Sequence, residues 1–154
     1  MKHVRLSQPK DVAYLSTRLR EDDLRELLAA GSSGPEQALS EGLRHSQECY
    51  SVIDAEDNAL VMFGVVPGET PEVGYIWLLG SDFIDKKPIM FLRYCRQWAD
   101  KLNTDFPILT NCVDKRNELH IKWLKWLGFT LLREVRGNGP GGLPFIEFAR
   151  IQNV

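Results

Sequence analysis

The 154-residue sequence predicts a mixed α/β sandwich, in which a mixed central sheet of about six to seven strands has helices on both faces. Two observations predict this fold class. Apolar residues alternate with period two in short segments and recur at three- and four-residue steps in longer ones, as expected for strands and helices. Along the chain these segments follow the order strand, helices, three strands, helix, strand, helix and two strands. The composition, 44% hydrophobic and 26% charged, is that of one globular domain spanning residues 1–154.

The first third of the chain is predicted to be one short strand followed by helices. Val4 and Leu6 alternate with polar residues, and Pro9 suits the first turn of a helix. We expect Asp22 and Asp23 to cap a second helix, which a Gly-Ser-Ser-Gly segment interrupts. A third helix follows that segment and begins at a proline.

The middle of the chain is predicted to form three consecutive strands. Residues 50–53 and 59–66 are largely apolar and flank an acidic turn, which is typical of a hairpin. Residues 72–79 are apolar on both faces, because Tyr75 and Trp77 share one face while the residues between and after them are apolar too. This third strand is therefore predicted to lie in the centre of the sheet.

Helices and strands alternate in the last third. Pro88 is well placed to start a long amphipathic helix. The later elements are expected at residues 107–113 (strand), 115–127 (helix), 129–135 (strand) and 143–150 (strand). Gly128 is a favourable C-cap for the last helix. The strands at 72–79 and 107–113 are expected to be parallel neighbours that splay apart, because a helical crossover connects them.

Composition and charge exclude several classes of function. Lys and Arg total 19 against 21 Asp and Glu, and this net charge of −2 is too balanced for a general nucleic-acid binder. The longest apolar run is eight residues, so neither secretion nor a membrane span is expected. Cys49, Cys95 and Cys112 lack metal-binding spacing and are interpreted as reduced thiols of a cytosolic protein. His3 and His45 are isolated, and no metal site is predicted.

The most specific motif lies at residues 117–129. Asn117 is near the start of the predicted helix, and the pair Gly128-Phe129 begins eleven residues later, where the helix ends and a strand begins. This spacing resembles the signature of the GNAT acetyltransferase superfamily, and the order of strands and helices agrees with the GNAT fold. The resemblance implies an N-acetyltransferase that takes acetyl-CoA as cofactor and a small-molecule or protein amine as acceptor, with a helix N-terminus facing the cofactor.

The expected cofactor site departs from the family pattern. Family members hold the diphosphate of coenzyme A with backbone N–H groups of a glycine-rich turn, whereas residues 80–88 here contain one glycine and two acids. Lys86 and Lys87 are candidates to replace the missing amide groups, and the alternative is that they belong to a solvated turn. The candidate cofactor-binding residues are Leu79, Lys86, Lys87 and Asn117. Coenzyme A binding through the lysines is expected to be weak and salt-sensitive.

The expected general acid is also altered. Family members commonly place a tyrosine five residues before the phenylalanine of the Gly-Phe pair, and here that position is Leu124. An apolar side chain cannot protonate a departing thiolate. Candidate catalytic residues therefore come from other positions: His120 on the same helix, Glu72 at the start of the central strand, and Tyr94 on the preceding helix. The alternative for His120 is an ordinary packing residue.

Further segments resemble one group within the superfamily, the GNAT-like internal virion proteins of T7-like podoviruses. The similar segments are residues 75–81, 109–111, 114–117 and 144–148. The resemblance implies a phage-encoded protein in the host cytoplasm or the virion. It leaves open a non-catalytic alternative, in which the protein acts in virion assembly or binds a host protein. The resemblance to the GNAT fold implies that the glycine-rich loop at residues 137–142 borders the acceptor pocket.

Overall fold

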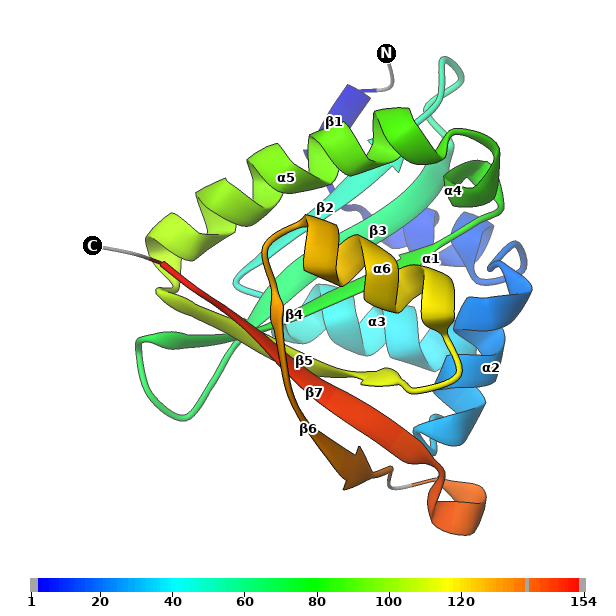
Figure 1. Cartoon of the computed structure of the whole chain (residues 1–154). Helices are drawn as coiled ribbons and strands as arrows, with labels where there is room; N and C mark the ends of the chain where they lie inside the picture. The colour runs from blue at the N-terminus through cyan, green and yellow to red at the C-terminus, as the bar shows by residue number, and fades with distance from the viewer. Residues whose placement is uncertain (1–2, 138, 153–154) are drawn as a thin grey trace.

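Figure 1 shows the computed structural model of the chain, which describes residues 3–137 and 139–152. The strands are β1 (His3–Leu6), β2 (Glu48–Ile53), β3 (Ala59–Pro67), β4 (Val73–Gly80), β5 (Ile108–Asp114), β6 (Thr130–Arg136) and β7 (Pro144–Ile151). The helices are α1 (Pro9–Leu15), α2 (Glu21–Ala29), α3 (Pro35–His45), α4 (Phe83–Lys86), α5 (Pro88–Asp105) and α6 (Glu118–Trp126), with a short 3-10 helix, η1 (Pro140–Gly142). The predicted order is confirmed, and α4 is an additional short helix that the sequence did not indicate.

The described strands form one seven-stranded sheet in the order β1-β2-β3-β4-β5-β7-β6. All neighbouring strands are antiparallel except β4 and β5, which are parallel. The connection between β4 and β5 contains α5, as a parallel crossover requires. The predicted mixed sheet, its central strand and the parallel pairing of β4 with β5 are therefore confirmed.

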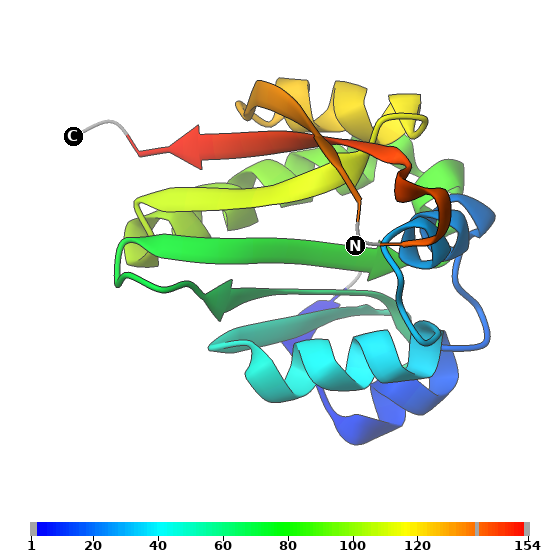
Figure 2. The ribbon, with the colours of Figure 1, turned by 90° about the horizontal axis from the view of Figure 1, so that it is seen from below.

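Helices cover both faces of the sheet. α5 and α6 lie on one face, α1 and α3 lie on the other, and α2 sits beside the ends of β4 and β5 (Figure 2). The core is split accordingly: Leu102, Leu109 and Leu124 pack beneath α5 and α6, whereas Leu15 and Leu39 pack on the opposite face. Burial of each such side chain contributes about 1.5–3 kcal/mol, so both layers are stabilised chiefly by apolar contacts with the sheet.

The end of α6 is fixed by the glycine cap that the sequence predicts. Gly128 has φ of +90°, a conformation that glycine adopts without the steric cost of a Cβ atom. Its N–H donates to Lys125 O (3.1 Å), and the N–H of Phe129 donates to Leu124 O (2.9 Å), which together form a Schellman motif. The cap turns Phe129 into the core, where it is buried.

The predicted cap of α2 is wrong. Arg20 is the N-cap residue, and Asp22 and Asp23 lie in the first turn of the helix. The carboxylate of Asp23 accepts a hydrogen bond from the backbone N–H of Gly80 at the end of β4 (2.9 Å). A contact between residues distant in sequence therefore takes the side chain that local preference would assign to capping.

The loop between β6 and β7 packs closely against the end of α2. A Cβ atom at Gly139 would lie 2.1 Å from the carbonyl oxygen of Ala29, so only glycine fits there. Within the predicted loop at residues 137–142, Asn138 lies outside the described residues. Ala30 and Gly31, directly after α2, line a cavity in the middle of the sheet. The loop between β6 and β7 therefore supports one wall of that cavity.

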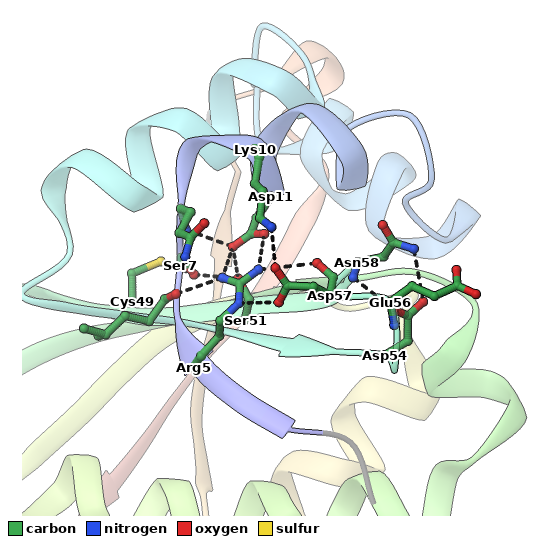
Figure 3. Close-up of polar contacts among 12 residues, drawn as sticks. Arg5, Ser7, Lys10, Asp11, Cys49, Ser51, Asp54, Glu56, Asp57 and Asn58 are labelled. Atoms are coloured by element: carbon green, nitrogen blue, oxygen red, sulfur yellow. Dashed lines mark hydrogen bonds and ion pairs between the residues drawn. The ribbon is translucent and has the colours of Figure 1, made fainter.

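A partly buried ion pair joins β1, α1 and β2 at the N-terminal edge of the sheet. The Arg5 guanidinium donates two hydrogen bonds of 2.8 Å to the Asp11 carboxylate, and Ser51 donates a third of 2.8 Å (Figure 3). Arg5 also donates to Asp57 in the β2–β3 turn (2.8 Å). Burial raises the pKa of Asp11, but the hydrogen bonds from Arg5, Gln8 N–H and Ser51 outweigh burial and lower it overall.

Candidate active site

β4 and β5 separate partway along their length. Their parallel pairing ends at Tyr75 and Thr110, although both strands run on for several residues. Asn111 bridges the point of divergence, because its Nδ2 donates a hydrogen bond of 2.7 Å to Ile76 O. Figure 2 shows the two strands diverging toward α2. The predicted splay is confirmed, and it leaves a gap in the middle of the sheet.

The direction of the β4 backbone determines which groups face this gap. Glu72 O accepts a hydrogen bond from Ile108 N–H (2.9 Å), so Glu72 directs its carbonyl toward β5. Successive residues of a strand direct their backbone groups to opposite sides. The N–H and C=O groups of Ile76, Leu78 and Gly80 therefore point toward the β5 side as well.

Leu78 is the open position among these three residues. Ile76 O is bonded by the Asn111 side chain. At Gly80, the N–H donates to Asp23 Oδ2 and the C=O accepts from Arg20 N–H, both at 2.9 Å. Between these two occupied positions β5 has moved away from β4. The backbone N–H and C=O of Leu78 thus face the gap without a neighbouring strand.

A cavity of about 680 Å³ fills the gap and reaches both faces of the sheet. On the face of α5 and α6 its walls are largely apolar, and they include Phe91, Tyr94, Cys95, His120 and Leu124. On the face of α2 and α3 the walls are more polar, and they include Glu26, Ser32, Gln37, Glu41 and His45. Two ligands that enter from opposite faces can therefore meet at the gap beside Leu78.

Glu26 is the carboxylate best placed to move a proton in this cavity. Its Oε1 accepts a hydrogen bond of 2.9 Å from the backbone N–H of Asp114, which orients the side chain from α2 toward the end of β5. Burial raises the pKa of Glu26 and outweighs the opposing effects of the Asp114 N–H and of nearby Asn117. A raised carboxyl pKa brings the group closer to the range useful for accepting a proton at neutral pH.

His120 lies on α6 and lines the same cavity. Burial lowers the pKa of its imidazole, and the repulsion from Arg20 adds to that effect, while Asp23 opposes it. Because the pKa falls below the usual value of 6.5, the ring is neutral at pH 7 and has one nitrogen free to accept a proton. The structure therefore brings His120 and Glu26 to one cavity from two helices far apart in sequence.

Asn117 is the N-cap of α6 and is only 3% exposed. Neither its Oδ1 nor its Nδ2 has a hydrogen-bond partner among the described residues. Its side chain nevertheless lies close enough to Glu26 to favour the charged carboxylate. An unpaired buried amide costs about 1–3 kcal/mol, so this position is poised to bond a water molecule or a polar group that enters beside Glu26.

The other candidate cofactor residues are spread over three environments. Leu79 is buried and lines the cavity, but its backbone groups face β3 by the alternation described above. Lys86 forms an exposed ion pair with Asp82 (3.3 Å). Lys87 lies in a second, more open pocket along the outer side of α5, which also contains Arg93. The two lysines are therefore not directed to a common site.

Of the remaining catalytic candidates, one lies in the main cavity and one does not. Tyr94 lines the main cavity from α5, and Leu124 lines it from α6. Glu72 is exposed beside the first residue of β4, at the opposite end of that strand from Gly80, and is absent from the cavity walls. Because a strand rises about 3.3 Å per residue, Glu72 is separated by nearly the whole length of β4 from the end that lies near α2. The structure therefore does not bring Glu72 together with His120.

Three elements of the site were missed by the sequence analysis. Glu26 belongs to a helix rich in acids, and its burial follows only from packing against β5. Asn111 is one polar residue in a strand, and nothing in its spacing distinguishes it. Leu78 had a usable signal, because a strand that leaves its parallel neighbour must expose alternate backbone groups.

No protein-family model matches the sequence, and no curated protein matches it. Solved structures do match over nearly the whole chain. The ribosomal-protein-S5-alanine acetyltransferase from Vibrio fischeri has 19% identity and a TM-score of 0.69, covering 99% of this chain and 93% of its own. A GCN5-related N-acetyltransferase from Kribbella flavida has 18% identity and a TM-score of 0.71, covering 98% of each chain. A mutant spermidine N-acetyltransferase from Vibrio cholerae has 10% identity and a TM-score of 0.71, covering 97% and 94%.

The chain has the fold of the GNAT acetyltransferases, with the divergent parallel strand pair at its centre. Within residues 3–137 and 139–152, no group of three or more His, Cys, Asp and Glu side chains is arranged to hold a metal ion. In the same part of the chain, no helix is both long and apolar enough to cross a membrane.

Proposed function

We propose that this protein is an N-acyltransferase of the GNAT superfamily, which transfers an acyl group from a pantetheine thioester such as acetyl-CoA to an amine. The observation that carries the proposal is the gap between β4 and β5, where the backbone groups of Leu78 lack a pairing strand among the described residues and face a cavity that reaches both faces of the sheet. The similar solved structures support the reaction class, since those named above are N-acetyltransferases.

The residues around the gap fit the thioester end of such a donor. When bound, the donor supplies an activated acyl group and a thiol leaving group. Leu78 N–H can donate a hydrogen bond to the acyl carbonyl oxygen, where negative charge develops as the amine attacks. The apolar walls of α5 and α6, including Phe91, Cys95 and Leu124, suit the uncharged arm of the donor and exclude water.

The opposite mouth of the cavity suits an amine. Glu26 and Glu41 place two carboxyl groups on its wall, which favours an approaching ammonium ion. The ammonium ion first loses one proton to give the nucleophilic amine, and the nitrogen loses a second proton as the C–N bond forms and the C–S bond breaks. Glu26 is the proposed acceptor of the first proton, and neutral His120, the second base in the cavity, is the proposed acceptor of the other. The thiolate takes its proton from Tyr94 or from water, because Leu124 has none to give.

A second candidate function is a non-catalytic protein that binds a host or virion partner. The similarity of four segments to phage internal virion proteins supports it, and with it a location in the host cytoplasm or the virion. One structural observation favours it: in the turn where relatives are expected to hold a diphosphate, the amide groups of residues 81 and 83–87 are already bonded within the chain. Loss of cofactor binding would leave the fold free for such a role.

Acyl transfer from S-acetylpantetheine and from acetyl-CoA to a panel of amines, followed by mass spectrometry, tests the proposal. We expect an acetylated amine, and we expect Glu26→Gln to lower kcat by about 10²–10⁴-fold. Glu21→Gln is the matched control, because Glu21 is exposed on the same helix and is not in the cavity wall. No transfer from either donor to any amine would favour the binding protein instead.

A further inference from the structure

The turn after β4 has no free cradle of amide groups for a phosphate. Of its backbone N–H groups, those of residues 81, 83, 84, 85, 86 and 87 all donate to acceptors in the chain itself, at 2.9 to 3.3 Å. Two of the acceptors are the carbonyl oxygens of Leu60 and Asp82, and a third is the Ser81 hydroxyl. A phosphate needs several convergent N–H groups, and binding one here would break these bonds.

The charges of the same turn oppose an anion. Asp82 and Asp85 are both exposed on it. Lys86 is held by Asp82 (3.3 Å). Arg20, the buried cation beside the turn, already contacts Asp85 (3.1 Å) and two aspartates of α2. Lys86 and Arg20 are therefore neutralised by neighbouring carboxylates, whereas Lys87 lies in the second pocket on α5.

The start of α5 adds little to replace the missing cradle. Its first residue, Pro88, has no N–H group, and Phe91 N–H already donates to Lys87 O (3.0 Å). Only Ile89 and Met90 remain to offer amides from the first turn, and their apolar side chains are exposed around that helix end. A helix N-terminus with two available donors holds a doubly charged group poorly.

We infer that the donor is recognised by its acyl group and pantetheine arm, and that this chain does not bind the diphosphate of coenzyme A. The inference rests on the proposed function and names its donor class: a pantetheine thioester for which the nucleotide end is dispensable. The binding free energy comes from the gap at Leu78 and from the apolar walls on α5 and α6. Binding through such contacts is insensitive to salt.

Calorimetry with S-acetylpantetheine and acetyl-CoA on the unmodified protein tests this inference. We expect dissociation constants within about threefold of each other, and no weakening of acetyl-CoA binding between low salt and about 0.5 M NaCl. Each charge-assisted hydrogen bond to a phosphate strengthens binding by about tenfold or more. A functioning diphosphate site would therefore make the dissociation constant of acetyl-CoA clearly lower than that of S-acetylpantetheine.

One result would overturn this inference alone, and a different result would overturn the proposed function on which it rests. If acetyl-CoA binds at least about tenfold more tightly and salt removes the difference, a diphosphate site exists and the inference is wrong. If the difference in affinity between acetyl-CoA and S-acetylpantetheine disappears in the double variant Lys87→Ala/Arg93→Ala, the phosphates bind in the second pocket on α5. If neither compound binds, the proposed acyltransferase function fails as a whole.

Discussion

Asn111 Nδ2 donates a hydrogen bond of 2.7 Å to Ile76 O at the point where β4 and β5 stop pairing. The Oδ1 of the same side chain accepts from the N–H of Cys112 (2.8 Å). One amide therefore satisfies a backbone group on each strand, where the regular ladder ends. Because this side chain takes the place of the next bonds of the ladder, β5 can leave β4 beyond this point, and the cavity beside Leu78 can form.

Replacing Asn111 with leucine leaves two backbone groups without partners. We expect Asn111→Leu to lower the free energy of unfolding by about 1–3 kcal/mol, measured by urea denaturation. The same variant should weaken binding of S-acetylpantetheine, since the edge of the gap is no longer fixed. Unchanged stability together with unchanged binding would show that Asn111 does not define the gap.

The raised pKa of Glu26 predicts the pH dependence of the reaction. Glu26 must be ionised to accept a proton, so kcat should rise with pH through a carboxyl pKa higher than the ordinary value of 4.5. In Glu26→Gln the remaining activity should lose that acidic limb, while the Glu21→Gln control keeps it. A limb that persists in Glu26→Gln would assign the proton transfer to another group, with His120 the next to test.

Leu124 offers a gain-of-function test of the missing general acid. Tyrosine at this position would place a hydroxyl on the cavity wall of α6, where it can protonate the thiolate. We expect Leu124→Tyr to raise kcat for acetyl transfer by about tenfold or more. Leu124→Phe is the matched control, because it adds the ring without the hydroxyl. An equal rise in both variants would trace the effect to packing.

The Arg5–Asp11 pair predicts a pH-dependent loss of stability on mutation. Arg5→Met leaves the buried Asp11 carboxylate unpaired and should cost about 2–4 kcal/mol near pH 7, the smaller end reflecting the partial exposure of Arg5. In the native protein the pKa of Asp11 is lowered, so its stabilisation is present above about pH 4 and is lost as pH falls further.

Arg5→Met removes the strongest of the interactions that lower the pKa of Asp11, so this pKa should be higher in the variant than in the native protein. The difference in unfolding free energy between the two proteins should then shrink as the pH is lowered from 7 toward 4, as measured by denaturant titrations. Asp57→Asn, at the exposed partner of Arg5, is the control and should have little effect. A pH-independent difference would mean that Asp11 is not the group left unpaired.

Local signals predicted much of the fold, and contacts distant in sequence explain what they missed. Gly128 and Phe129 define the end of α6 through neighbouring residues alone, so their spacing is readable in the sequence. Aspartate is a common helix-capping residue, but the Asp23 carboxylate accepts a hydrogen bond from the N–H of Gly80, which lies 57 residues away in the sequence. Glu26 likewise becomes a site residue only because α2 packs against β5. The positions of these two side chains depend on tertiary packing, which the spacing of residues within one helix cannot predict.

The most direct test of the acyltransferase account is the response of backbone amides to a donor, measured by ¹H–¹⁵N correlation NMR during titration with S-acetylpantetheine. The account predicts that the largest shifts fall on Leu78 and on the residues around it in the gap, with Asn111 and His120 among them. Shifts confined to the outer side of α5 at Arg93 and Gln97, or no shifts at all, would contradict it.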